Sequence, residues 1–344
     1  MSQLPKNRGR MRIQANEIGK HNFAAKTPVK PKLRESLFWL CICWIFLPSL
    51  AVGSNAMIRP IQVKHVMDVG GDFNQPTEVA VDRGGRIFIL DGANNQVKVF
   101  NPKGEFVLAI GRAGKENGEF RNPVGMDIDE RGHVYIADTG NQRIQIFDGT
   151  GKYLRKIDLS RWKTRPVEVN VLKGANRIYV SDAKNHRILC FNRDGAFNFL
   201  WGDLGEQLGE LRFPGMMAVD QSGDIYVVDI LNGRVQIFNP MGKNPRQIGK
   251  LGVLPGQLFR PKGIAIDDRS RIYVSDSYTG ILQVFDKAGK LHGILSQKGG
   301  AFLHLTTPVG MAIDSKGRLY VVQSSLNKVS VFKLPDKGRD KLSE

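Results

Sequence analysis

Residues 123–147 read PVGMDIDERGHVYIADTGNQRIQIF, and this stretch decides the fold. It opens on a proline, alternates apolar and polar residues with period two, turns at Arg131-Gly132, alternates again and closes on Phe147. Alternation of Val, Ile, Tyr and Phe between Gly and Asp turns is typical of antiparallel strands joined as hairpins. The stretch therefore predicts an all-β domain.

The same pattern recurs along the chain. Its opening prolines stand 47, 43, 48, 47 and 47 residues apart, at Pro76, Pro123, Pro166, Pro214, Pro261 and Pro308. Its closing phenylalanines follow the same rhythm, at Phe100, Phe147, Phe191, Phe238, Phe285 and Phe332. A four-stranded meander cannot cover both of its own faces, so each repeat must pack on the next, and radial repetition closes the series into a ring. Six repeats predict a six-bladed β-propeller.

The last repeat lacks a fourth strand, because a charged tail at 336–344 follows shortly after Phe332. A missing outer strand would leave an unpaired sheet edge. The segment 61–69, IQVKHVMDV, precedes the first repeat and belongs to none of them. We expect it to supply the outer strand of blade six, so that residues 57–335 form one closed domain.

The chain ahead of this domain has the composition of an export signal. Residues 1–36 hold nine Lys and Arg against two Glu without apolar periodicity, which predicts a basic, disordered cytoplasmic leader. The range 37–56 begins with LFWLCICWIFL and ends in small residues. This order is typical of a signal peptide, and the same residues, left uncleaved, could serve as a transmembrane anchor. Either reading places the domain outside the cytoplasm, in the periplasm or extracellular space, or tethered to the membrane.

Composition narrows the function further. The 344 residues are 41% hydrophobic, enough for a sizeable core, and only three are Cys, which excludes a disulfide scaffold or a multi-cysteine zinc module. The net charge is +17, and removal of the leader's +7 (nine basic minus two acidic residues) leaves +10, a surplus that favours polyanionic partners. RNA is one candidate, but export and the lack of aromatics interleaved with the basic residues argue against nucleic acid. A protein or an envelope polyanion is the expected partner, with the membrane as a further one if 37–56 is retained.

The repeats resemble those of NHL-repeat β-propellers of a bacterial, exported or anchored type. The resemblance covers residues 60–334 and rests on a Pro-x-Gly opening, a Tyr-Val-x-Asp strand and an Asp-x-x-Asn-x-Arg loop. It implies six blades, but the family includes ubiquitin ligases, RNA-binding regulators, receptor-kinase sensors and an amidating lyase, so it does not choose a function. The lyase is expected to hold zinc through histidines near the channel, and no residue directly after the six opening prolines is His.

The Asp-x-x-Asn-x-Arg loop is complete in three repeats, at Asp138, Asn141, Arg143, Asp182, Asn185, Arg187, Asp229, Asn232 and Arg234. A ring of binding loops is one interpretation. The other is structural, because a strand-end Asp can accept loop N–H groups while the Arg pairs with it. The sequence favours the structural role and predicts looser loops in repeats five and six, where Ile281 and Gln323 break the pattern.

Inner strands crowd at the axis of a propeller, so their middle positions should be small. Blades two and three instead carry Asp127 and Asn170 there, and blades one and three carry Glu78 and Glu168 two residues past the opening proline, at the mouth of the channel. These side chains form a candidate ligand-binding sector with oxygen donors suited to Ca²⁺, or they simply hold water in the channel.

We expect a non-catalytic binding or scaffold module of the cell envelope with no catalytic residue and no cofactor. A metal-dependent lyase or lactonase, using Ca²⁺ or Zn²⁺ at this sector, is the first alternative, and an RNA-binding domain is the second.

Overall fold

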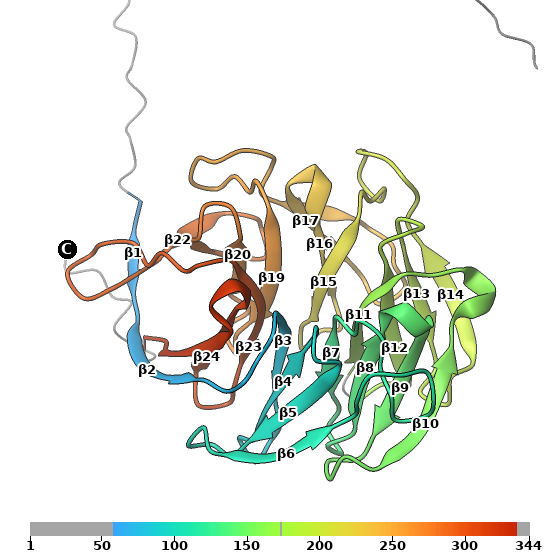
Figure 1. The fold of residues 1–344 in the computed structure, drawn as a ribbon. Helices are drawn as coiled ribbons and strands as arrows, with labels where there is room; N and C mark the ends of the chain where they lie inside the picture. The colour runs from blue at the N-terminus through green and yellow to red at the C-terminus, as the bar shows by residue number, and fades with distance from the viewer. Residues whose placement is uncertain (1–57, 173, 336–344) are drawn as a thin grey trace, which may run out of the picture. The chain divides into compact units, whose positions relative to one another are not determined.

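The computed structural model describes residues 58–172 and 174–335, which form a six-bladed β-propeller built almost entirely of strands (Figure 1). The basic leader, the expected signal or anchor at 37–56 and the tail at 336–344 lie outside the described residues. Within the part that is described, no helix has the length and apolar character needed to cross a bilayer.

Each blade is a four-stranded antiparallel meander whose first strand lies nearest the axis. Blade one consists of β3 (Pro76–Val81), β4 (Ile87–Asp91), β5 (Gln96–Phe100) and β6 (Phe106–Ile110). Blade two consists of β7 (Met126–Ile128), β8 (Val134–Asp138), β9 (Arg143–Phe147) and β10 (Tyr153–Asp158). Blade three consists of β11 (Pro166–Leu172), β12 (Arg177–Asp182), β13 (Arg187–Phe191) and β14 (Phe197–Trp201).

The other three blades repeat the plan. Blade four consists of β15 (Pro214–Val219), β16 (Ile225–Asp229), β17 (Arg234–Phe238) and β18 (Arg246–Ile248). Blade five consists of β19 (Pro261–Ile266), β20 (Ile272–Asp276), β21 (Leu282–Phe285) and β22 (Leu291–Ser296). Blade six consists of β23 (Pro308–Ile313), β24 (Arg318–Gln323) and β25 (Lys328–Lys333). Four short 3-10 helices lie in the connections: η1 (Thr139–Asn141), η2 (Ser160–Trp162), η3 (Ile230–Asn232) and η4 (Ser324–Leu326).

The hydrophobic core lies between neighbouring blades rather than within any one of them. The second strand of a blade is covered on both faces, and all five residues of β4 and of β8 are buried. One cluster, for example, joins Phe88 of blade one to Ile136 and Phe147 of blade two. Because each blade contributes its two faces to two different clusters, no blade can bury its apolar surface alone.

The ring closes through two strands that precede blade one, β1 (Pro60–Gln62) and β2 (Lys64–Val69). The expected outer strand of blade six is β2, which pairs antiparallel with β25. The expectation that 61–69 forms one strand in one blade is wrong, because β1 pairs parallel with β22 and becomes a fifth strand of blade five. Glycine at 293 in β22 permits this approach, since a Cβ there would lie within 3.0 Å of Ile61 Cγ1.

Candidate functional site

The inner strands of all six blades enclose a central cavity of about 720 Å³. Its lining includes each of the four residues of the predicted ligand-binding sector: Glu78, Asp127, Glu168 and Asn170. They lie on β3, β7 and β11, the first strands of blades one to three. The structure therefore brings the predicted residues together in one place.

Two glycines make room for the two glutamates. Gly310 in blade six faces Glu78 of blade one, and a Cβ at 310 would lie 2.6 Å from both Cα and Oε1 of Glu78. Gly125 in blade two faces Glu168 of blade three in the same way, with 2.6 Å to its Cα and 2.9 Å to its Cδ. Both glycines belong to the Pro-x-Gly openings, so the absence of a side chain in one blade allows a long polar side chain in the next.

Glu78 and Glu168 are almost fully buried, with exposed fractions of 5% and 2%. The Oε1 atom of each accepts a hydrogen bond from the following backbone N–H, at 2.9 Å for Val79 and 2.8 Å for Val169. The two carboxyl groups are also hydrogen-bonded to each other. One of them must be protonated to donate this bond, because an ionised carboxylate only accepts.

Burial raises the pKa of both carboxyl groups, because removal from water penalises the charged form. The pKa of Glu78 rises to about 8. The pKa of Glu168 rises well above its usual value, and the negative charges of Glu78 and Asp127 raise it further. At neutral pH both carboxyl groups therefore stay protonated, and the pair is neutral.

Asp127 has a different role, since backbone groups occupy both of its oxygens. Its Oδ1 accepts from Ile128 N at 2.7 Å, and its Oδ2 accepts from Val171 N at 2.8 Å. The second bond runs from blade two to blade three. Asp127 therefore ties these blades together while adding negative charge beside the glutamate pair.

Asn170 offers an unused acceptor in the same cavity. Its Oδ1 is buried, and no donor among the described residues bonds to it. A buried acceptor without a partner costs free energy unless a ligand or solvent supplies a donor. Asn170 is thus the side chain of the sector best placed to receive a hydrogen bond from a ligand.

The donor set does not have the geometry of a metal centre. Within residues 58–172 and 174–335, no three His, Cys, Asp or Glu side chains gather around a common cation position. The cavity lining also contains no histidine. His65, His133 and His292 each contact an aspartate that is not part of this lining. What the sector offers is a neutral carboxyl pair, a carboxylate and an amide.

The cavity also has acidic residues that the sequence reasoning did not single out. Asp220, Asp267 and Asp314 line it just beyond the ends of the inner strands. Each accepts the hydroxyl proton of a tyrosine on the second strand of its own blade, at 3.0 to 3.2 Å. An Asp that recurs directly after the apolar inner strand could have predicted these residues from the sequence. Their hydrogen bonds to tyrosines indicate a structural role.

The Asp-x-x-Asn-x-Arg loops are structural in the same sense. Asp138 is fully buried, and its Oδ2 accepts from Arg143 Nε at 2.7 Å and from Asn141 Nδ2 at 2.9 Å. Its Oδ1 accepts the backbone N–H of Arg121, which ties the incoming connection to the loop. The same contacts recur in the loops of blades three and four, at Asp182, Asn185 and Arg187 and at Asp229, Asn232 and Arg234.

In blades five and six, where the motif is incomplete, other hydrogen bonds hold the loop. Asp276 accepts N–H groups from Phe259, Arg260, Tyr278 and Thr279. Gln323 takes the aspartate position in blade six, where its Oε1 accepts from Thr306 N at 2.9 Å. The residue at each position is buried, so these loops keep their anchor without the arginine.

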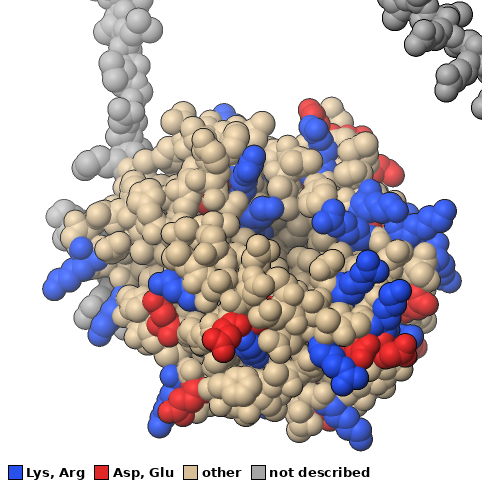
Figure 2. Space-filling model, in the orientation of Figure 1, with Lys and Arg blue, Asp and Glu red and all other residues tan. Residues whose placement is uncertain are grey.

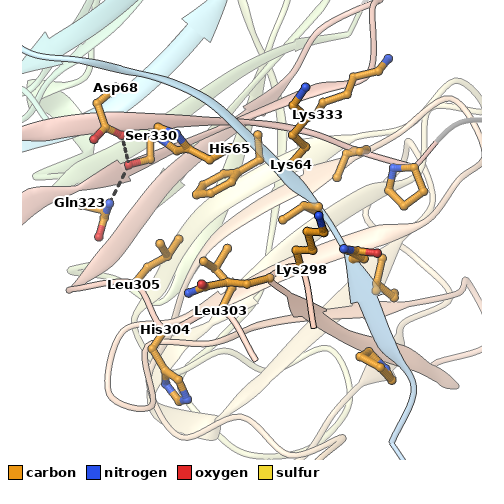
Figure 3. A pocket seen from close by; sticks show the side chains of 18 of the residues that line it. Lys64, His65, Asp68, Lys298, Leu303, His304, Leu305, Gln323, Ser330 and Lys333 are labelled. Carbon is orange, nitrogen blue, oxygen red and sulfur yellow. Dashed lines mark hydrogen bonds and ion pairs between the residues drawn. The ribbon is translucent and has the colours of Figure 1, made fainter. Parts of the chain in front are cut away.

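A second hollow of about 1140 Å³ lies where β1 and β2 close the ring. Figure 3 shows Lys64, Lys298 and Lys333 around it, with Leu303 and Leu305 in its wall. Ser330 donates to Asp68 at 2.6 Å and accepts from Gln323 at 2.7 Å, so this chain of bonds links β2 to blade six. This hollow was not predictable from the sequence, because it exists only once the ring is closed.

Comparisons with known proteins support the architecture. The family model of a six-bladed β-propeller matches residues 73–168. No curated protein matches the chain. Among solved structures, a streptogramin B lyase aligns with a TM-score of 0.58 and 12% identity, covering 78% of this chain and 97% of the other.

Two further solved structures have the same arrangement. A virginiamycin B lyase from Staphylococcus aureus, in a catalytically inactive form with quinupristin, aligns with a TM-score of 0.57 and 14% identity over 77% of this chain and 82% of its own. A gluconolactonase from Xanthomonas campestris aligns with a TM-score of 0.60 and 16% identity, covering 80% of this chain and 95% of its own. At these identities the likeness shows the fold alone.

Proposed function

We propose that this chain is an NHL-type propeller of the cell envelope that binds an uncharged, polar small ligand in its central cavity without converting it. The observation that carries the proposal is the proton-sharing pair Glu78–Glu168 in the wall of that cavity. A protonated carboxyl group both donates and accepts hydrogen bonds, as a ligand hydroxyl or amide requires. Asn170 supplies a further acceptor.

Charge argues against an anionic ligand. Asp127 stands beside the pair and carries this argument. Asp220, Asp267 and Asp314 also line the cavity, but each forms an ion pair, with Lys287, Arg271 and Arg318 respectively. A ligand carboxylate or phosphate would have to approach Asp127 in a partly desolvated space, where like charges repel strongly. Neutral sugars and amides avoid this cost.

The test uses neutral sugars, N-acetylated amino sugars and small amides as probes. Saturable binding by calorimetry, weakened at least tenfold by Asn170→Ala or Glu168→Ala, would support the proposal. The exposed Glu206 provides the matched control, and Glu206→Ala should leave binding unchanged. Binding that ignores the cavity substitutions would overturn the proposal. Fractionation of cells tests the envelope location separately.

A metal-dependent lyase or lactonase is the second candidate. The observation in its favour is a pair of carboxyl groups with raised pKa values in the cavity of a fold shared with lyases and a gluconolactonase. A divalent cation would have to displace the protons of the pair, so its affinity would increase steeply between pH 6 and pH 9. Stoichiometric Ca²⁺, Mn²⁺ or Zn²⁺ binding lost in Glu78→Gln, together with hydrolysis of gluconolactone, would replace the first proposal by this one.

RNA binding, the remaining alternative, predicts tight association that weakens steeply with salt. Cytoplasmic recovery of the native protein together with such binding would favour it over both cavity-based functions.

A further inference from the structure

The connections between successive blades gather on one face of the propeller, called here the loop face. It consists of the segments that lead into each opening proline and the turns between second and third strands. Hydrogen bonds join the two sets, as from Leu231 N to Arg212 O and from Asn141 Nδ2 to Gly114 O. Bonds also run between blades, as from Thr139 Oγ1 to Pro166 O and from Phe213 N to His186 Nδ1. The loop face is therefore a continuous surface.

Large apolar side chains are exposed on the loop face at blades four and five. Their exposed fractions lie between 52% and 64%, at Leu204, Leu208, Leu231, Leu251, Leu254 and Tyr278. The loops that carry Leu231 and Leu251 are close together, since a Cβ at Gly233, which follows η3, would lie 2.7 Å from Leu251 Cα. The ring of Tyr278 packs on that of Phe259, with 4.6 Å between the ring centres. Large apolar side chains exposed on one face of a protein, here called the apolar patch, are typical of an interaction site.

The fold does not require these residues. The connection 111–122 has the same Gly pattern as 202–213, and Phe120 is buried as Leu211 is. At the positions of Leu204 and Leu208, however, 111–122 carries Ala113 and Asn117. The buried anchor is thus common to both connections, whereas the exposed leucines occur in 202–213 and not in 111–122.

Basic residues flank the apolar patch on blades two and three. The cluster consists of Arg121, Arg161, Lys163, Arg165 and Lys184, all exposed. None of the five forms an ion pair with any residue of the described part of the chain, and the guanidinium of Arg161 lies 3.6 Å from the ring centre of Trp162. Figure 2 shows Lys and Arg gathered on the right of the molecule, where Figure 1 places blade three.

We propose that the loop face docks on an anionic phospholipid surface. The leucines and Tyr278 would enter the boundary between headgroups and acyl chains, while the basic cluster and Trp162 lie at the level of the phosphates. Apolar side chains beside a polybasic patch are the two signals that together hold a protein at such a surface. Among the exposed carboxylates of these connections, Glu206 is paired with Arg212.

Two observations favour a lipid surface over a protein partner. Leu204, Leu251 and Leu254 are exposed in glycine-containing turns, from which their side chains can insert between lipids. The apolar run at 37–47 lies in the same chain and predicts that the domain is delivered to, or held at, a membrane. Retention of that run would raise the effective concentration of lipid at the domain.

The test uses the full chain reconstituted into vesicles, with a fluorescent probe attached through Leu251→Cys in a background of Cys41→Ala and Cys43→Ala. Lipids brominated in the acyl chain quench a probe that reaches them. We expect at least twofold quenching in vesicles of phosphatidylcholine with 30% phosphatidylglycerol, and little in phosphatidylcholine alone. The matched control is a probe through Val107→Cys, on exposed strand β6, which should not be quenched in either.

Charge reversal then separates the contribution of the basic cluster from that of the exposed apolar side chains. Arg161→Glu with Lys163→Glu should abolish the quenching at 251, while Lys103→Glu, on the turn after β5, should not. Glu168→Gln in the cavity should leave it intact, so that this proposal stands or fails independently of ligand binding. Equal quenching at 251 and 107, or quenching that does not depend on phosphatidylglycerol, would overturn the proposal. Absence of quenching, together with binding to an acidic protein, would overturn it too and would show that the loop face binds a protein.

Discussion

Glu78 and Glu168 belong to blades one and three, yet their carboxyl groups share a hydrogen bond at the axis of the propeller. Each is placed by a glycine of the preceding blade, Gly310 and Gly125. The bond joins groups 90 positions apart in the chain across blade two. It gives the cavity a neutral carboxyl pair and makes the ring sensitive to pH.

Stability should fall as the pH rises from about 5 to about 9. The unfolded glutamates lose their protons near their usual pKa of 4.5, whereas the folded pair holds its protons up to a pKa of about 8 for Glu78. The folded state binds more protons throughout this interval, so the free energy of unfolding decreases with rising pH. The thermal midpoint, followed by calorimetry across this range, measures the effect.

Glu168→Gln should flatten that dependence, because an amide stays neutral and still donates to Glu78. Glu206→Gln, at an exposed position, should keep the slope of the parent protein. A slope that persists unchanged in Glu168→Gln would show that other groups cause it.

Gly125→Ala should destabilise the protein by about 1–3 kcal/mol, since forcing extra volume into a packed region displaces its neighbours. The added Cβ would lie 2.5 Å from Val167 O and 2.6 Å from Glu168 Cα, and backbone atoms cannot rotate away. Urea unfolding measures the change. Gly70→Ala is the control, because nothing lies within 4 Å of its Cβ, and a loss of similar size there would refute the steric explanation.

Asp138→Ala should cost about 3–5 kcal/mol, because it leaves the buried guanidinium of Arg143 without its counter-charge. Only 7% of the Arg143 side chain is exposed, and several loop groups lose their acceptor as well. Asp203→Ala, on an exposed connection, should change the free energy of unfolding by less than about 0.5 kcal/mol. Similar losses at 138 and 203 would contradict the structural role of the motif.

Gly293→Ala should release β1 and leave β2 in place. The new Cβ would collide with Arg59 O, the acceptor of Ile294 N on β22, while β2 is held by β25 and by Ser330 donating to Asp68. Hydrogen exchange should therefore increase at Val63, whose N–H bonds to Ser296 O, and not at 64–69. Faster exchange over both segments would mean that the two strands act as one unit.

The repeats predicted the propeller because proline, apolar alternation and phenylalanine recur at one spacing, and the spacing alone defines six equivalent sheets. The gathering of Glu78, Asp127, Glu168 and Asn170 was also predictable, since equivalent positions of inner strands meet at the axis. Their chemistry was not, because the Glu78–Glu168 bond depends on how far each side chain reaches across the closed ring. The pairing of β1 with blade five escaped prediction because three residues carry no readable period, and only Gly293 on the opposite strand signals it.

The two-strand closure has a mechanical consequence. Tension applied to the chain upstream of Arg59 would reach β1 first, and β1 runs parallel to β22, so the load would act along the strand pair in shear rather than peel it open. The force that β1 does not bear would pass to β2 and blade six. A propeller pulled from this end would distribute the force over two neighbouring sheets.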